Sequence, residues 1–113
     1  NGIEIDTACR HNLPIICVIV NNGGITAKPR DKAAEMPGQD LGTPDYQMVA
    51  TAFGGYGERV EKAEDIAPAL KRALASGLPS IINVIVDPYV ASATHLGFAG
   101  VMSASYGEGK KGE

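Results

Sequence analysis

The sequence has no tryptophan, only 5% aromatic residues and just two cysteines among its 113 residues. Cys9 and Cys17 do not form a Cys-x-x-Cys pair and have no metal-type partners nearby in the sequence, which argues against a disulfide framework, a metal site and a catalytic thiol. We therefore expect two reduced core thiols in a cytoplasmic protein. No apolar run is long enough to cross a bilayer, and no basic patch stands out at a net charge of −3. We thus expect neither a membrane nor a nucleic-acid partner.

The length of 113 residues allows one globular domain at most, and the 44% of hydrophobic residues is ordinary for such a domain. The chain begins at Asn1 without an initiator methionine, and residues 3–11 already read as an amphipathic helix with Ile3, Thr7 and Ala8 on one face. We therefore expect this chain to be a piece of a longer one.

An aliphatic run at residues 15–20 ends abruptly in two asparagines and two glycines. The run lacks polar alternation, which predicts a parallel strand covered on both faces. Ligands of open α/β sheets bind just beyond the carboxyl ends of the strands. There Asn22 offers a side-chain oxygen, and the glycines let backbone carbonyls approach a hard cation. The pattern therefore predicts a Mg²⁺ or phosphate site at the tip of this strand.

The same Asn-Gly pair is also a strong signal for a two-residue β-hairpin turn. A hairpin needs a second strand directly afterwards, whereas residues 25–32 are charged, interrupted by Pro29 and not alternating. The hairpin is therefore the weaker interpretation, and residues 23–42 are expected to form a long functional loop.

A helix is predicted to begin at Thr43 and Pro44, because a hydroxyl N-cap followed by proline is a typical helix start. Its apolar positions follow at helical spacing, and Gly54 and Gly55 end it. These positions are Tyr46, Val49, Ala52 and Phe53.

The remaining pattern predicts a strand at 57–60, a helix at 64–75 and a strand at 80–86. Pro68 is expected to disturb one turn of that helix. The apolar stripe of the helix is Ile66, Leu70, Ala73 and Leu74. The order predicts an α/β fold: a doubly wound, mostly parallel sheet with flanking helices. Three strands are few for such a sheet, which predicts a partial domain.

The strand that ends in Asn21-Asn22-Gly23-Gly24-Ile25 resembles the second half of the thiamine diphosphate-binding motif, which opens with Gly-Asp-Gly or Gly-Asp-Ser and closes with Asn-Asn. The run from Tyr46 through Phe53-Gly54-Gly55, and the run Pro79 to Pro88, also resemble the pyrophosphate-binding domain of these enzymes. The resemblance covers residues 1–88 and is greatest to the oxalyl-CoA decarboxylase and 2-hydroxyacyl-CoA lyase branch.

The resemblance implies thiamine diphosphate and Mg²⁺ as cofactors. Asn22 would supply a side-chain ligand to Mg²⁺ and Gly24 a backbone carbonyl. Gly23, Ile25 and Thr26 would flank the diphosphate. Related sequences often have tyrosine where this chain has Thr26.

Two essential groups of such a site are expected outside this chain. The Gly-Asp-Gly with its aspartate ligand would lie just upstream of Asn1. The glutamate that tautomerises the aminopyrimidine would come from another domain, normally of a neighbouring subunit, which implies a homodimer or homotetramer. The glutamates of this chain are instead expected to be solvated charges: Glu4, Glu35, Glu58, Glu61 and Glu64.

For this branch the resemblance implies a lyase or decarboxylase that cleaves or forms the C–C bond beside an acyl-CoA carbonyl. Residues 89–113 would be a C-terminal tail, either a mobile linker or a lid over the CoA thioester. The candidate lid contacts to substrate are His95, Ser103, Ser105 and Tyr106.

Two other functions stay open. One is an acetolactate synthase-like carboligase, which shares the Asn-Asn strand. The other is a non-catalytic, flavodoxin-like binding module that keeps only the fold.

Overall fold

A computed structural model describes residues 2–25 and 37–90 of the chain. Helices and strands alternate in these two segments, as the sequence predicted. The elements are α1 (Glu4–Arg10), β1 (Ile16–Asn21), α2 (Gln47–Ala52), β2 (Tyr56–Val60), the 3₁₀ turn η2 (Ala63–Asp65), α3 (Ile66–Ser76) and β3 (Ser80–Ile85).

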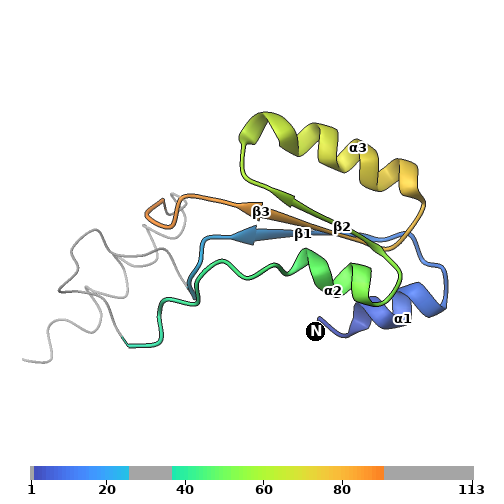
Figure 1. Ribbon diagram of the computed structural model, residues 1–113, viewed down its shortest axis with the longest axis horizontal. Coiled ribbons are helices and arrows are strands. Elements are labelled where there is room, and N and C mark those ends of the chain that lie inside the picture. The colour runs from blue at the N-terminus through green and yellow to red at the C-terminus, as the bar shows by residue number, and fades with distance from the viewer. Residues whose placement is uncertain (1, 26–36, 91–113) are drawn as a thin grey trace, which may run out of the picture.

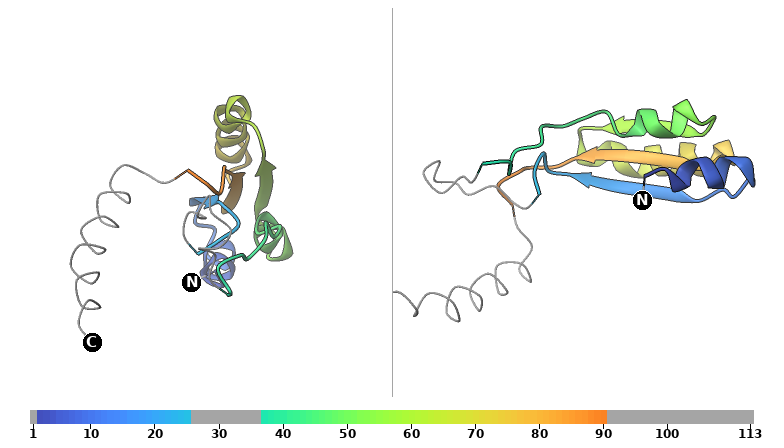
Figure 2. Two further views of the ribbon diagram at one scale, coloured as in Figure 1. Left: turned by 90° about the vertical axis from the view of Figure 1, so that its left-hand side faces the viewer. Right: turned by 90° about the horizontal axis from the view of Figure 1, so that it is seen from below.

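The three strands form a parallel sheet in the order β1-β3-β2, so the last strand in the sequence is the central one. Helices α1 and α2 lie on one face of this sheet and α3 lies on the other (Figure 1). Viewed from the side, the sheet forms the middle layer between the helices (Figure 2). The predicted parallel α/β fold with flanking helices is thus confirmed.

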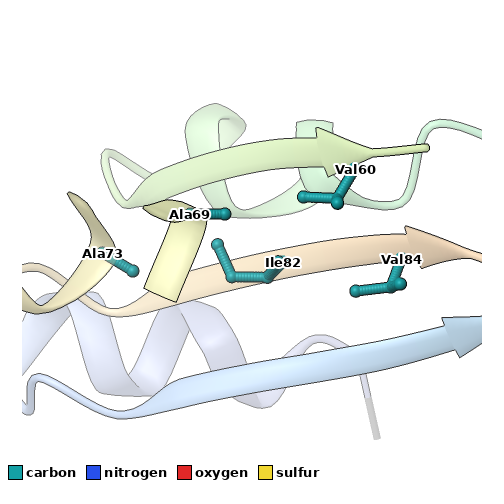
Figure 3. Close-up of a cluster of buried hydrophobic side chains, with 5 residues drawn as sticks. All are labelled: Val60, Ala69, Ala73, Ile82 and Val84. Carbon is teal, nitrogen blue, oxygen red and sulfur yellow. The ribbon is translucent and has the colours of Figure 1, made fainter. Parts of the chain in front are cut away.

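Each face of the sheet has its own small core because alternate residues of β3 point to opposite sides. Under α3, Ile82 and Val84 pack with Val60 of β2 and with two alanines of the helix, Ala69 and Ala73 (Figure 3). On the opposite face Ile81 packs with residues of α1 and α2, namely Ile5 and Ala50. Small alanines at the contacts let the helices approach the sheet closely.

The expected burial of β1 on both faces is wrong for the described residues. The side chains of Val18 and Val20 are 46% and 71% exposed. The physical reason is the position of β1 at the edge of the described sheet, while α3 contacts β2 and β3 instead. An aliphatic strand of this kind carries more apolar surface than its described neighbours cover.

The predicted start of α2 at Thr43 and Pro44 is also wrong, because the helix begins at Gln47. The Thr43 carbonyl accepts a hydrogen bond from the guanidinium of Arg59 at 3.0 Å. The Pro44 carbonyl accepts one from the Asn83 amide at 3.0 Å. Side chains from β2 and β3 therefore hold this segment in its approach to the helix.

The buried face of α2 differs from the predicted stripe as well. Gln47 and Ala50 are the buried positions, whereas Ala52 and Phe53 are exposed. The carbonyl group of Gln47 lies where a β-carbon on Gly57 would be, so the helix backbone packs directly against β2. This close approach turns the small and polar side of α2 toward the sheet.

The other two helices keep their predicted positions with small differences. In α1 the buried residues are Ile5 and Ala8, while Ile3 is 65% exposed. In α3, Leu74 is 70% exposed and lies outside the packed stripe. Pro68 falls in the first turn of α3, where its missing N–H has no intrahelical partner to lose, so the expected disturbance is not seen.

Both cysteines are free, as predicted, but they are not core residues: Cys9 is half-buried and Cys17 is exposed. None of the helices in residues 2–25 and 37–90 has the length and hydropathy of a membrane-spanning segment.

Candidate functional site

The asparagine pair forms two consecutive side-chain turns at the carboxyl end of β1. The Asn21 Oδ1 accepts a hydrogen bond from the Gly23 N–H at 3.1 Å, and the Asn22 Oδ1 accepts one from the Gly24 N–H, also at 3.1 Å. Gly23 has a φ of +70°, and a β-carbon there would come within 3.2 Å of the Gly42 carbonyl oxygen. The asparagines therefore suit this turn because their side chains bond its backbone, and Gly23 suits it because a larger residue would be strained and crowded there.

A second segment closes over the turn from residues 39–42. The Leu41 N–H donates to the Gly23 carbonyl at 2.8 Å, and the Ile25 N–H donates to the Gln39 carbonyl at 3.2 Å. These bonds flank an isolated antiparallel bridge between Gly24 and Asp40. The two-residue hairpin is thus not the observed structure. The antiparallel partner of the turn is Asp40, far along the sequence, and β1 pairs with β3 in parallel.

The turn borders a cavity of about 280 Å³ beyond the carboxyl end of β1. Its wall is apolar on the strand side and carries amide and backbone groups at the turn. The lining residues are Ile19, Val20, Asn21, Asn22, Gly24, Leu41, Gly42 and Tyr46. This is the place at which open α/β sheets bind ligands.

A chain of buried side-chain amides lies behind the turn. Asn83, in the middle of β3, is fully buried, and its Oδ1 accepts a hydrogen bond from the Asn21 amide at 3.1 Å. Its Nδ2 donates to the Gln47 Oε1 at 2.9 Å and to the Pro44 carbonyl at 3.0 Å. No buried side-chain nitrogen or oxygen in the described part of the chain lacks a partner.

The amide chain ends at an ion pair between the exposed Asp45 and the half-buried Arg59. The Gln47 Nε2 donates to the Asp45 Oδ1 at 3.0 Å, and the Arg59 guanidinium donates to the same oxygen at 3.1 Å. The hydrogen bond from Gln47, followed by the bond and charge of Arg59, holds the pKa of the Asp45 carboxyl below its ordinary value.

A second charged cluster lies on the α3 side of the sheet. Arg72 of α3 makes two hydrogen bonds to the carboxylate of Glu58 on β2, and the Tyr56 hydroxyl donates to that carboxylate too. Arg72 lowers the pKa of Glu58, and the carboxylate raises the pKa of the Tyr56 hydroxyl. Glu58 is therefore a paired, half-buried group, and the prediction of a solvated charge is wrong for it.

The other predicted residues fall into three groups: those at the turn, exposed glutamates, and residues outside the described segments. Asn22, Gly23, Gly24 and Ile25 lie together at the turn, with the Ile25 side chain 71% exposed. Glu4, Glu61 and Glu64 are exposed, as expected, although Glu61 also pairs with the Arg59 guanidinium at 2.9 Å. The remaining predicted residues lie outside the described segments: Thr26, Glu35, His95, Ser103, Ser105 and Tyr106.

Asn83 and Gln47 were missed by the sequence reasoning as functional candidates. A signal was present, because Asn83 interrupts the otherwise aliphatic strand at 81–86 and a buried amide has to find hydrogen-bond partners. In the described segments, no three His, Cys, Asp or Glu side chains cluster so as to hold a metal ion by themselves.

Residues 1–84 match the sequence profile of a family described as "Thiamine pyrophosphate enzyme, C-terminal TPP binding domain". The chain belongs to this family. The resemblance inferred from the Asn-Asn strand and the closing strand is therefore confirmed, and the described turn lies within the matched residues.

Curated relatives from several enzyme classes share this stretch. Acetolactate synthase large subunit IlvG of Mycobacterium tuberculosis (strain ATCC 25618 / H37Rv) is 42% identical over 100 residues, which cover 80% of this chain and 17% of that protein. 2-Hydroxyacyl-CoA lyase 1 of Homo sapiens is 38% identical over 101 residues, which cover 78% of this chain and 18% of that protein. Oxalyl-CoA decarboxylase of Escherichia coli (strain K12) is 37% identical over 95 residues, which cover 78% of this chain and 16% of that protein. The chain thus spans less than a fifth of the length of these relatives.

Proposed function

We propose that this chain supplies the half of a thiamine diphosphate site that holds the cofactor's diphosphate group through Mg²⁺. The observation that carries the proposal is the Asn21–Gly24 turn, which lies at the carboxyl end of a parallel strand and beside a cavity. Family membership supports the thiamine diphosphate part of the proposal, and the donor chemistry of the turn supports the Mg²⁺ part.

The residues present fit a magnesium–diphosphate group. Asn22 Oδ1 accepts one hydrogen bond from the Gly24 N–H and keeps a second lone pair for a ligand. Gly24 lacks a side chain that would shield its carbonyl. Mg²⁺ prefers hard oxygen ligands and usually completes its shell with water and substrate phosphates, so two neutral protein oxygens are a sufficient local contribution. Residues 2–25 and 37–90 contain no cluster of carboxylates that could hold a metal ion alone, which agrees with a shell completed by water and phosphate oxygens.

In this proposal each part of the chain has a binding role. Asn22 and the Gly24 carbonyl hold the cation, and Gly23, Ile25 and Thr26 flank the diphosphate. The aliphatic wall formed by Ile19 and Leu41 excludes water from one side of the cavity. When bound, thiamine diphosphate supplies a nucleophilic carbon and an electron sink for C–C bond chemistry.

We further propose that the chain acts within a longer polypeptide and a homodimer or homotetramer. The relatives are more than five times longer than the matched stretch, which supports the longer polypeptide. The exposed aliphatic residues of β1, Val18 and Val20, also support it, because a further segment packed there would cover them. The aspartate ligand and the glutamate that acts on the aminopyrimidine would come from those other parts.

For the reaction we propose a lyase or decarboxylase acting beside the carbonyl of an acyl-CoA. The closing strand Asn83-Val84-Ile85-Val86-Asp87-Pro88 and the two relatives named for CoA substrates support this class. Acetolactate synthesis is the second candidate, supported by the relative at 42% identity. Assays of the full-length protein with oxalyl-CoA, a 2-hydroxyacyl-CoA and pyruvate separate the two classes, because only the carboligase consumes pyruvate alone.

The variant Asn22→Ala tests the binding proposal. Removal of a ligand oxygen should raise the Mg²⁺ concentration that half-saturates thiamine diphosphate binding by about 10–100-fold, measured by calorimetric titration of the full-length protein. Asn22→Asp is the matched control, because it keeps an oxygen at the same place and should retain Mg²⁺-dependent binding. An unchanged Mg²⁺ dependence in Asn22→Ala would rule out the assigned ligand.

A further inference from the structure

Three side-chain amides are almost completely buried in the described part of the chain, and they touch one another. The exposed fractions of Asn21, Gln47 and Asn83 are 6%, 9% and 0%. They come from β1, α2 and β3, and the two hydrogen bonds between them span 62 and 36 residues of sequence. Burying several amides is unfavourable unless all their hydrogen bonds are made, so this arrangement needs a physical reason.

The hydrogen bonds that link these amides in series run in one direction, and the Nδ2 groups of Asn21 and Asn83 also donate to the Pro44 carbonyl at 3.4 and 3.0 Å. The Gly23 N–H donates to the Asn21 Oδ1, and the Asn21 Nδ2 donates to the Asn83 Oδ1. The Asn83 Nδ2 donates to the Gln47 Oε1, and the Gln47 Nε2 donates to the Asp45 Oδ1. Each amide therefore receives a hydrogen bond on its oxygen and passes one on from its nitrogen. We call this series of amides the amide relay.

Both ends of the amide relay impose that direction. The backbone N–H of Gly23 can only donate, and the carboxylate of Asp45 can only accept while it is ionised. Arg59 donates to the same carboxylate oxygen and keeps it charged. A reversed amide anywhere in the relay would place two donors or two acceptors against each other. The orientation of Asn21, and with it the Gly23 backbone, is thus set from across the same face of the sheet, where Asp45 pairs with Arg59 of β2.

We infer that Asn83 and Gln47 are positioning residues that hold the Asn21–Gly24 turn in the shape that binds Mg²⁺ and the diphosphate. This inference deepens the proposed function and rests on it for the identity of the ligand. Both side chains act on the ligand site through Asn21, which itself lines the cavity. Their effect reaches the cation through the peptide of Gly23, which lies between Asn22 and Gly24.

A purely structural role for the same amides makes different predictions. Asn83 also bonds the Pro44 carbonyl, so it helps to tie the segment before α2 to the sheet. If that were all it did, its loss would lower stability and leave the Mg²⁺ dependence as it is. A test therefore needs a control variant that lowers stability from the same strand without touching the relay.

The experiment compares Asn83→Asp with Ile82→Val in the full-length protein. The carboxylate introduced by Asn83→Asp can still accept from Asn21, but its second oxygen faces two acceptors, the Pro44 carbonyl and the Gln47 Oε1. Ile82 lies on the opposite face of β3, in the core under α3. Asn83→Asp should raise the half-saturating Mg²⁺ concentration for thiamine diphosphate binding by about 10–100-fold, as for other groups that orient a metal ligand. Ile82→Val should leave it within about twofold of wild type, because it touches no group that orients a ligand.

Gln47→Glu provides a graded second variant. The introduced carboxylate keeps an acceptor for Asn83 but meets Asp45 with a negative charge in place of a donor. The relay is then broken one step further from the turn, so the rise in half-saturating Mg²⁺ should go in the same direction and be smaller. This variant keeps the inference testable if Asn83→Asp does not fold.

Hydrogen exchange of the Gly23 amide in the cofactor-free protein supplies a readout that does not depend on ligand binding. It should be faster in Asn83→Asp than in Ile82→Val, because the Pro44 carbonyl and the Gln47 Oε1 repel the new carboxylate and displace the group to which Asn21 donates, so that the Asn21 acceptor moves with it. If wild type binds thiamine diphosphate without Mg²⁺, the proposed metal role fails, and faster Gly23 exchange still supports the relay. If wild type needs Mg²⁺ and Asn83→Asp matches Ile82→Val in both readouts, the inference is overturned.

Discussion

A single methyl group on Gly57 should separate α2 from β2. A β-carbon at this position overlaps the Gln47 carbonyl oxygen and lies 2.9 Å from its carbon, whereas ordinary van der Waals contact starts at 3.4 Å. The carbonyl carbon alone therefore has to retreat by the difference of 0.5 Å, and the oxygen by more. Both obstacles are backbone atoms of a helix, which cannot swing aside as a flexible side chain does.

The size of the effect follows from two opposing contributions. Overpacking against a rigid neighbour costs about 3 kcal/mol, the upper part of its usual range, because the whole helix has to shift. Replacing glycine in a strand with alanine returns roughly 0.5–1 kcal/mol of backbone entropy. The net loss of local stability for Gly57→Ala is about 2 kcal/mol, and a factor of ten corresponds to about 1.4 kcal/mol, so the effect is roughly 30-fold.

Hydrogen exchange by mass spectrometry on the full-length protein measures this loss locally. Peptides from Gln47–Ala52 should exchange roughly 30-fold faster in Gly57→Ala than in wild type. Gly2→Ala is the control, since no atom lies within 4 Å of a β-carbon there. Its exchange should stay within about threefold of wild type. If α2 in Gly57→Ala exchanged like the control, the close backbone approach between α2 and β2 would be refuted.

Two further predictions concern the other face of the sheet. Arg72 holds the pKa of Glu58 below its ordinary 4.5, so the stabilisation from this pair is present at neutral pH and is lost as the pH falls below 4.5 and through the folded-state pKa. The difference in unfolding temperature between wild type and Glu58→Gln should therefore shrink between about pH 7 and about pH 3, and a constant difference would contradict the pairing. Ile82→Ala should lower the free energy of unfolding by about 2–5 kcal/mol, because the side chain is fully buried under α3. Leu74→Ala should change it by less than about 0.5 kcal/mol, because Leu74 is 70% exposed. Chemical denaturation measures both changes.

The sequence predicts strands and their ends better than helix starts. The aliphatic runs around Ile19 and Ile82 are strands at the expected places because continuous β-branched residues favour strands, although only the run around Ile82 is buried on both faces. The predicted start of α2 is misplaced since Thr43 and Pro44 have the local chemistry of a helix cap. Tertiary hydrogen bonds from Arg59 and Asn83 take the carbonyls of that segment instead. A local signal is overridden by partners that are distant in the sequence.

The candidate site shows the same division. Asn22 and Gly24 are predictable because their turn is built from adjacent residues, each side chain bonding the backbone two residues on. Asn83 is predictable only as part of a buried strand, because nothing nearby in the sequence tells which groups its amide meets.

By itself, the sequence determined the alternation of helices and strands, the parallel sheet and the Asn-Asn-Gly-Gly turn at the end of β1. These features depend on periodicity and on bonds between near neighbours, which the order of residues contains directly. Only the tertiary structure decided that β3 is central, that Gly57 admits the backbone of α2, and that Asn83 connects Asn21 to Gln47. These depend on contacts across 10 to 64 residues of sequence, from Gly57–Gln47 to Ile16–Ser80, whose partners become neighbours only when the sheet is assembled.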